Sequence, residues 1–172
     1  NVANALYFQR KLQEALAAYE RRLAIERERT DDAGIAAATL GIGTVLYSRF
    51  EYADALVRYR DALALFERLH DVPGMATTLI STGNVQFVQG DFAGALADYR
   101  RSRDLYHQNA DSRGEAGASE GLGRTLAAQG DLAGALNAYA FVLQEGRARS
   151  DEALQANALK SIGEIHFRLG NL

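Results

Sequence analysis

Apolar and small residues recur along the chain three and four residues apart, which is the spacing of one face of an α-helix. One such run consists of Tyr52, Ala55, Leu56, Tyr59, Ala62, Leu63 and Phe66. A second consists of Met75, Leu79, Thr82, Gly83 and Gln86. The runs alternate with short polar or glycine-containing segments. The pattern therefore predicts an all-α chain built from pairs of helices.

The pattern repeats with a period of 40 residues and without a slip. The segments at 50–56, 90–96 and 130–136 align, a weaker copy lies at 10–16, and a truncated copy lies at 170–172. Three columns keep one residue type, namely Asp at 31, 71, 111 and 151, Tyr at 19, 59, 99 and 139, and Gly at 43, 83, 123 and 163. A fixed period of this length indicates a stack of supersecondary units, each of which needs its neighbours to bury its apolar faces.

Residues at the ends of the runs predict where the helices begin and end. An Asp can accept hydrogen bonds from free N–H groups, so the aspartates at 31, 71, 91, 111, 131 and 151 are expected to cap the helices that follow. Gly90 and Gly130 suit the left-handed conformation after a helix, and Pro73 suits a first helical turn. Connections of four to five residues are expected to turn neighbouring helices antiparallel. The expected helices span about 2–9 (a stub), 12–29, 34–49, 52–70, 74–89, 92–109, 113–129, 132–149 and 152–169.

These columns resemble the tetratricopeptide repeat. Ile42-Gly43, Leu122-Gly123 and Ile162-Gly163 match the leucine-glycine element of its first helix. The second helix is matched by Ala15, Ala55, Ala95 and Ala135 and by the tyrosine column, whereas the final alanine is kept only as Ala62. The longer period is similar to that of kinesin light chains, Leu-Gly-Asn-repeat adaptors and bacterial multidomain proteins. The resemblance implies a right-handed α-solenoid of antiparallel helix–turn–helix units.

The repeat register also implies a domain organisation. We expect residues 1–172 to form a single array, with units at about 1–30 (partial), 31–70, 71–110, 111–150 and 151–172 (partial). No polar capping helix is visible at either end, so the chain is expected to be a fragment of a longer protein.

In this family the first helix of each pair lines a concave groove, and the resemblance places that lining on this chain. The predicted partner-binding residues are Asn4, Tyr7, Phe8, Leu40, Thr44, Tyr47, Ile80, Asn84, Phe87, Val88, Glu120, Arg124, Lys160, Glu164, Phe167 and Arg168. The small residues Gly117, Ala127 and Ala128 predict the roomiest pocket in the third pair. The aromatic residues of the N-terminal half either recognise a partner or pack against their neighbours, and the sequence leaves both interpretations open.

Polar residues in the same columns offer two further interpretations. Asn4 and Asn84 occupy the column in which the family often uses asparagine to hold a peptide backbone, although a solvated amide is an equal alternative. Glu120 with Arg124, and Lys160 with Glu164, are expected to pair along and between helices. Such pairing leaves few free cations, which argues against a clamp for a C-terminal carboxylate.

Composition narrows the function classes. The formal net charge is −3, there is no Cys, and there is no apolar run long enough to span a bilayer. His70, His107 and His166 are far apart in the repeat, and the chain contains no HExxH sequence, phosphate-binding loop or nucleophile elbow. The one dense basic spot, Arg100, Arg101 and Arg103, is expected to face solvent. We therefore expect no enzyme activity, cofactor or metal, and no nucleic-acid or membrane partner. The arginine bias and the absence of Cys favour a bacterial, cytoplasmic protein.

The sequence thus predicts a scaffold that holds a protein or peptide in its concave groove. The alternative is a regulatory or self-associating segment of a larger bacterial signalling enzyme or transcription regulator. Uncapped terminal repeats could also stack end to end.

Overall fold

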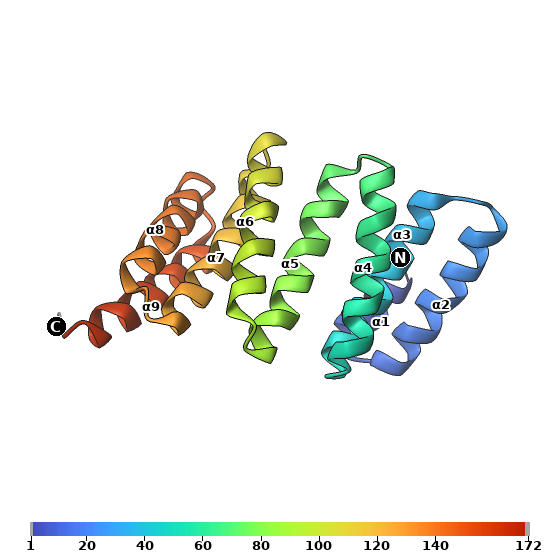
Figure 1. Cartoon of the computed structure of the whole chain (residues 1–172), viewed down its shortest axis with the longest axis horizontal. Helices are drawn as coiled ribbons and strands as arrows, with labels where there is room; N and C mark the ends of the chain where they lie inside the picture. The colour runs from blue at the N-terminus through green and yellow to red at the C-terminus, as the bar shows by residue number, and fades with distance from the viewer. Residues whose placement is uncertain (1, 171–172) are drawn as a thin grey trace. The chain divides into compact units, whose positions relative to one another are not determined.

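The computed structural model describes residues 2–170, which fold into helices joined by short turns, with no β-strand in that range (Figure 1). The helices are α1 (Val2–Phe8), α2 (Leu12–Glu28), α3 (Asp32–Ser48), α4 (Tyr52–Arg68), α5 (Val72–Gln89), α6 (Phe92–Gln108), α7 (Ser112–Gln129), α8 (Leu132–Ala148) and α9 (Glu152–Arg168). The predicted helices are confirmed, and every predicted start lies within two residues of the observed one. Asn171 and Leu172 of the truncated last copy lie outside the described residues.

The chain divides into two compact units, residues 1–85 and residues 86–172, and the boundary falls within α5. In the first unit, the core lies between α1, α2, α3 and α4, with Ala15, Ala55 and Tyr59 almost wholly buried. In the second unit, one core cluster joins α8 to α9 through Ala135, Tyr139 and Ile165. The alanine and tyrosine columns of the sequence are therefore core positions in both units.

The turns are shorter than predicted. They contain three residues, as at 49–51, or two residues, as at 90–91, instead of four to five. The reason is that one residue in the left-handed region reverses the chain directly after each helix. After α4, His70 (φ 54°) takes this conformation, its N–H donates to the Glu67 carbonyl, and the Asp71 N–H donates to the Phe66 carbonyl.

The left-handed position is not reserved for glycine. Gly90 (φ 81°) and Gly130 (φ 89°) occupy it as predicted. Six other residues also adopt it, namely Arg10, Thr30, Phe50, His70, Ala110 and Ser150, with φ between 53° and 64°. A side chain with a Cβ costs roughly 1 kcal/mol there, so the paired hydrogen bonds of each turn must offset that strain.

The predicted aspartate caps are confirmed. Each side chain accepts a hydrogen bond from the backbone N–H three residues later, at 2.9 to 3.1 Å, in Asp31, Asp71, Asp91, Asp111, Asp131 and Asp151. The helices α2 and α4 begin after Lys11 and Glu51, whose side chains make no such bond. The caps satisfy N–H groups that would otherwise lack partners at the start of six helices.

Glycines of the first helices lie against tyrosine rings of the second helices. A Cβ on Gly41 would lie 2.2 Å from the Tyr19 ring, and one on Gly43 would lie 2.6 Å from the Tyr59 ring. In the second unit, a Cβ on Gly121 would lie 2.5 Å from the Tyr99 ring. These positions admit only glycine because a buried ring occupies the space that a side chain would need. The tyrosine rings therefore fix how closely the first and second helices of a pair approach, and so which side chains of the first helix remain exposed.

Candidate functional site

The predicted groove residues all lie on the first helix of a pair, α1, α3, α5, α7 or α9, and none of them is buried. The more exposed ones are Asn4, Phe8, Val88, Glu120, Arg124, Lys160, Glu164, Phe167 and Arg168. The half-buried ones are Tyr7, Leu40, Thr44, Tyr47, Ile80, Asn84 and Phe87. The first unit holds those up to Asn84, and the second unit holds the rest.

Aromatic contacts connect the predicted residues of the first unit. The Tyr7 and Phe8 rings pack edge to face with centroids 5.7 Å apart, and the Tyr7 hydroxyl is 3.0 Å from Ser48 Oγ. Tyr47 packs against Tyr52 of α4 at the same centroid distance. Tyr7 and Tyr47 thus pack against neighbours, as one interpretation held, yet both remain partly open to solvent. Phe8 is 79 % exposed and leaves most of its ring free.

Tyrosine hydroxyls from the second helices lie beneath this surface. The Tyr19 hydroxyl donates a hydrogen bond to Asn4 Oδ1. The Tyr59 hydroxyl bonds to Thr44 and Ser81, and burial of the phenol raises its pKa to about 12. Burial also raises the pKa of Tyr19. These contacts restrain Asn4 and Thr44 at the surface of the first helices, a role that the sequence indicates only through the repeated spacing of the tyrosines.

In the second unit, Arg124 is held by two aromatic side chains. Its Cζ lies 4.4 Å from the centroid of the Phe87 ring, within cation–π range. Its Nη2 atom donates a hydrogen bond of 3.0 Å to the Tyr99 hydroxyl. Phe87 in turn packs against Phe92 of α6, with centroids 5.6 Å apart. The guanidinium is therefore restrained at the surface that α5 and α7 contribute to this unit.

Part of the predicted charge lattice is present on the surface of the second unit. Lys160 and Glu164 pair at 3.8 Å on α9, with both side chains well exposed. Burial raises the pKa of the Tyr139 phenol. The nearby carboxylates of Glu120 and Glu164 also raise this pKa, whereas Arg124 lowers it. Arg168 donates a hydrogen bond of 2.9 Å to the backbone carbonyl of Ala127. Exposed pairs of this kind contribute little to stability, so they shape the charge of the surface more than the fold.

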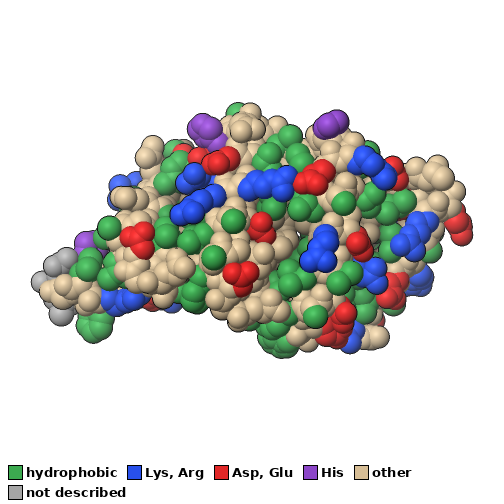
Figure 2. Space-filling model, in the orientation of Figure 1, with side chains coloured by type: hydrophobic (Ala, Val, Ile, Leu, Met, Phe, Trp, Pro, Cys, Tyr) green, Lys and Arg blue, Asp and Glu red, His purple; other side chains and the backbone are tan. Residues whose placement is uncertain are grey.

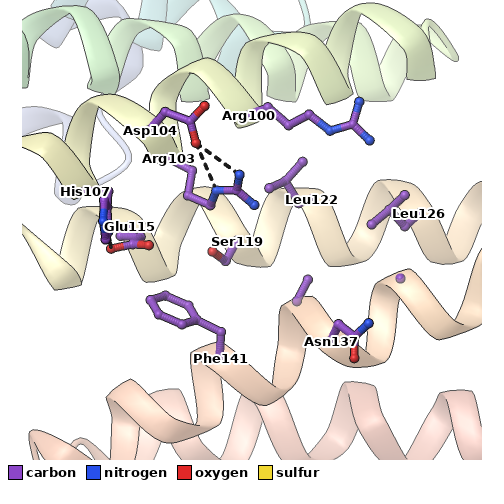
Figure 3. Close-up of a pocket in the computed structure, with 12 residues that line it drawn as sticks. Arg100, Arg103, Asp104, His107, Glu115, Ser119, Leu122, Leu126, Asn137 and Phe141 are labelled. Carbon is purple, nitrogen blue, oxygen red and sulfur yellow. Dashed lines mark hydrogen bonds and ion pairs between the residues drawn. The ribbon is translucent and has the colours of Figure 1, made fainter.

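The pocket described in the third repeat lies on another face of α7 than the one predicted. It has a volume of about 490 Å³ and is lined from α6, α7 and α8, for example by Arg100, Leu122 and Phe141 (Figure 3). The residues expected to form the roomiest pocket, Gly117, Ala127 and Ala128, are not among its lining. Small side chains on one open helix face flatten the surface, whereas a hollow needs walls from neighbouring helices.

Within residues 2–170, no group of three or more His, Cys, Asp or Glu side chains is arranged to hold a metal ion. In the same range, no helix has both the length and the apolar character that crossing a bilayer requires.

Comparison with known proteins identifies the repeat. Residues 34–108 match the family model of the tetratricopeptide repeat. BtubC (BKLC) from P. vanneervenii has a similar fold, with a TM-score of 0.87 at 13 % identity over 98 % of this chain and 70 % of that chain. The TPR-like repeats of a kinesin light chain from Podosopora anserina give a TM-score of 0.78 at 13 % identity, covering 98 % of this chain and 84 % of that one.

The apo form of RapI is a more distant structural relative, with a TM-score of 0.66 at 21 % identity over 99 % of this chain and 68 % of that chain. No curated protein matches the chain in sequence. At these identities the similar structures establish the fold alone, an all-α helical-repeat solenoid. Residues 34–108 thus match the tetratricopeptide repeat itself, and the glycine, alanine and tyrosine columns and the similar structures support the same repeat along the rest of the chain.

Proposed function

We propose that the chain is a scaffold that binds a protein or peptide on the surface formed by the first helices of its repeats. The single observation that supports this most strongly is the exposure of the predicted groove residues, aromatic ones included. Tetratricopeptide repeats generally serve protein interaction, and exposed aromatic rings are common anchors at protein interfaces.

The first unit offers apolar and amide contacts. Phe8 and part of the Tyr7 and Tyr47 rings are open, and Asn4 and Thr44 lie beside them on the same helices. The hydroxyls of Tyr19 and Tyr59 restrain these two polar side chains, so less conformational entropy is lost when a partner binds. This arrangement suits an extended or helical segment with apolar side chains.

The second unit offers a charged surface with few free cations. Arg124 is engaged by Phe87 and Tyr99, Lys160 by Glu164, and Arg168 by the Ala127 carbonyl. A carboxylate of the partner would have to compete with these contacts. The proposal therefore assigns affinity to the aromatic residues and orientation to the charged ones.

Loss of an aromatic groove side chain is expected to weaken a bound peptide at least tenfold. Peptides selected from a random displayed library against the whole chain would be measured by calorimetry against Phe8→Ala and Tyr47→Ala variants. Anchoring rings of this kind typically contribute more than about 1.4 kcal/mol, which corresponds to that factor. Ile25→Ala is a matched control, because it removes a half-exposed apolar side chain from α2, a second helix. Equal affinity of all variants, with circular dichroism unchanged, would count against the groove.

A second candidate function, self-association within a larger regulatory protein, is favoured by the surface of α9. Gly163 has no atom within 4 Å of a built Cβ, whereas Gly43 and Gly123 are covered by the rings of Tyr59 and Tyr139. Leu159 (51 % exposed) and Phe167, which are four residues before and after Gly163 and so on the same side of α9, are also exposed.

If α9 mediates association, light scattering is expected to show a molar mass that rises with protein concentration. Gly163→Arg should suppress the rise, because it places a charge on this surface without an internal clash. Gln144→Arg adds the same charge to an exposed position of α8 and should leave the rise unchanged. A constant monomer mass in the unmodified chain would exclude association through α9.

A further inference from the structure

The pocket between α6, α7 and α8 lies away from the proposed groove. Its floor includes Leu122 and Leu126 of α7, which stand two residues from the groove residues Glu120 and Arg124 and so point to the other side of that helix. Its walls include Arg100 and Arg103 of α6 and Phe141 of α8 (Figure 3). We name this pocket of about 490 Å³ the outer furrow.

The first unit has the same furrow in a blocked form. Between α2, α3 and α4 lie two smaller pockets of about 300 and 210 Å³, and Arg58 lines both of them. The residue at the corresponding place in the second unit, 80 positions later, is Ala138, which lines the outer furrow. A long side chain therefore divides the first furrow, and a methyl group leaves the second one continuous.

The two furrows also differ in charge. Glu20, Asp54 and Asp61 line the pockets of the first unit. Their counterparts in the outer furrow are Arg100, Gly134 and Phe141. At these three places the outer furrow has an arginine, a glycine and an aromatic ring instead of carboxylates, while its own carboxylates, Asp104 and Glu115, stand where the first unit has Ala24 and Ile35.

Most charges in the outer furrow are already paired. Arg103 bonds to Asp104 at 3.0 Å, and His107 Nδ1 lies 3.1 Å from Glu115 Oε2. Arg100 belongs to none of the ion pairs described within residues 2–170, and its side chain extends along α6 above Leu122 (Figure 3). On the face shown in Figure 2, basic and acidic side chains are interspersed with apolar ones, with no extended basic surface over α6 and α8.

We propose that the outer furrow binds a segment of a partner protein that combines one bulky apolar side chain with a nearby carboxylate. The apolar side chain would lie on Leu122, Leu126 and Phe141, and the carboxylate would pair with Arg100. A polypeptide fits better than a small molecule, because the furrow is open along one side and would cover only one face of its ligand. A nucleic acid fits less well, because phosphate backbones require several free cations.

The test is an NMR titration of the whole ¹⁵N-labelled chain with alanine-based peptides. In three of them a Glu follows a Phe two, three or four positions later, and each has a matched peptide with Gln in place of Glu. Amides of α6, α7 and α8 around the furrow should shift, and the best Glu peptide should bind two- to fivefold more tightly than its Gln partner, the range of an exposed ion pair. Arg100→Glu should remove that preference. Arg60→Glu, the corresponding change on α4, should preserve it.

Blocking variants are supplied by the first unit itself. Ala138→Arg and Phe141→Asp copy Arg58 and Asp61, and each should abolish the shifts while circular dichroism stays unchanged. The proposal is overturned if no peptide binds below about 1 mM, if both blocking variants bind normally, or if the shifts map to the groove residues instead. Tighter binding of decanoate or of a ten-nucleotide oligo-dT at the same amides would also overturn it, in favour of a small amphiphile or a nucleic acid. Because the groove residues are unchanged in these variants, failure here leaves the proposed function intact.

Discussion

Replacement of Gly114 by leucine is expected to destabilise the second unit by about 3 kcal/mol, because the new side chain has no room to enter. Gly114 lies in the first turn of α7, and a Cβ there would be 2.2 Å from Cδ1 of Tyr106. Tyr106 is a buried side chain of α6, so its ring cannot move aside without leaving the core. Urea unfolding measures the loss, and hydrogen exchange should place it in α6 to α8 rather than in α2 to α4.

The fourth repeat indicates the compensating change. The residues 40 positions after Tyr106 and Gly114 are Gly146 and Leu154. In the earlier copy the large residue lies on the second helix and the glycine on the first helix of the next pair, and in the later copy this order is reversed. Tyr106→Gly alone is expected to cost about 4 kcal/mol through the cavity that it leaves. The double variant Tyr106→Gly with Gly114→Leu should be more stable than the sum of the single effects by about 2 kcal/mol. Additivity within about 0.5 kcal/mol would show that the two columns do not share one packing site.

The helices and their caps could be predicted from the sequence because their signals are local and repeated. A cap such as Asp111 needs only the backbone three residues ahead of it, and the same aspartate recurs in each copy. The turns are shorter than the sequence predicts because residues other than glycine also adopt the left-handed conformation. Ala110 and His70 adopt it without that sign, since the hydrogen bonds of the turn impose it.

The candidate site could be predicted as a set of positions but not as a set of contacts. Column spacing predicts that Arg124 lies on an outward face of its helix, and its side chain is exposed on α7. Its partners Phe87 and Tyr99 come from two other helices, and a long flexible side chain can reach many neighbours at that distance. The outer furrow was missed for a related reason, because it depends on three helices and on the size of one residue, Ala138.

Repetition supplies comparisons that a single fold lacks. Arg58 and Ala138 show what a furrow looks like when filled and when open, and Gly123 and Gly163 show a glycine that is covered and one that is not. The first pair differs in one side chain, and the second differs in whether a tyrosine ring of another helix lies over the glycine. For the outer furrow, the first unit therefore serves as the control for the second.

Removal of the Tyr99 side chain is expected to destabilise the second unit as strongly as removal of the Tyr106 side chain. Tyr99 is completely buried on α6, and its ring fills the space over Gly121 of α7. Truncation to alanine should lower the free energy of unfolding by about 4 kcal/mol, through lost burial and the cavity that remains. The same change removes the hydroxyl that accepts a hydrogen bond from Arg124 at the surface of α7.

Tyr99→Phe separates these two roles. Phenylalanine keeps the ring over Gly121 and removes the hydroxyl that accepts from Arg124, so unfolding should become easier by about 1 kcal/mol. The Arg124 side chain should become more mobile, which nitrogen relaxation of its guanidinium would detect, while its contact with Phe87 persists. Equal losses from the alanine and phenylalanine changes would show that the hydroxyl, and not the ring, holds this part of the unit together. A small loss with a mobile Arg124 would show that the tyrosine column uses its rings for the fold and its hydroxyls for the binding surface.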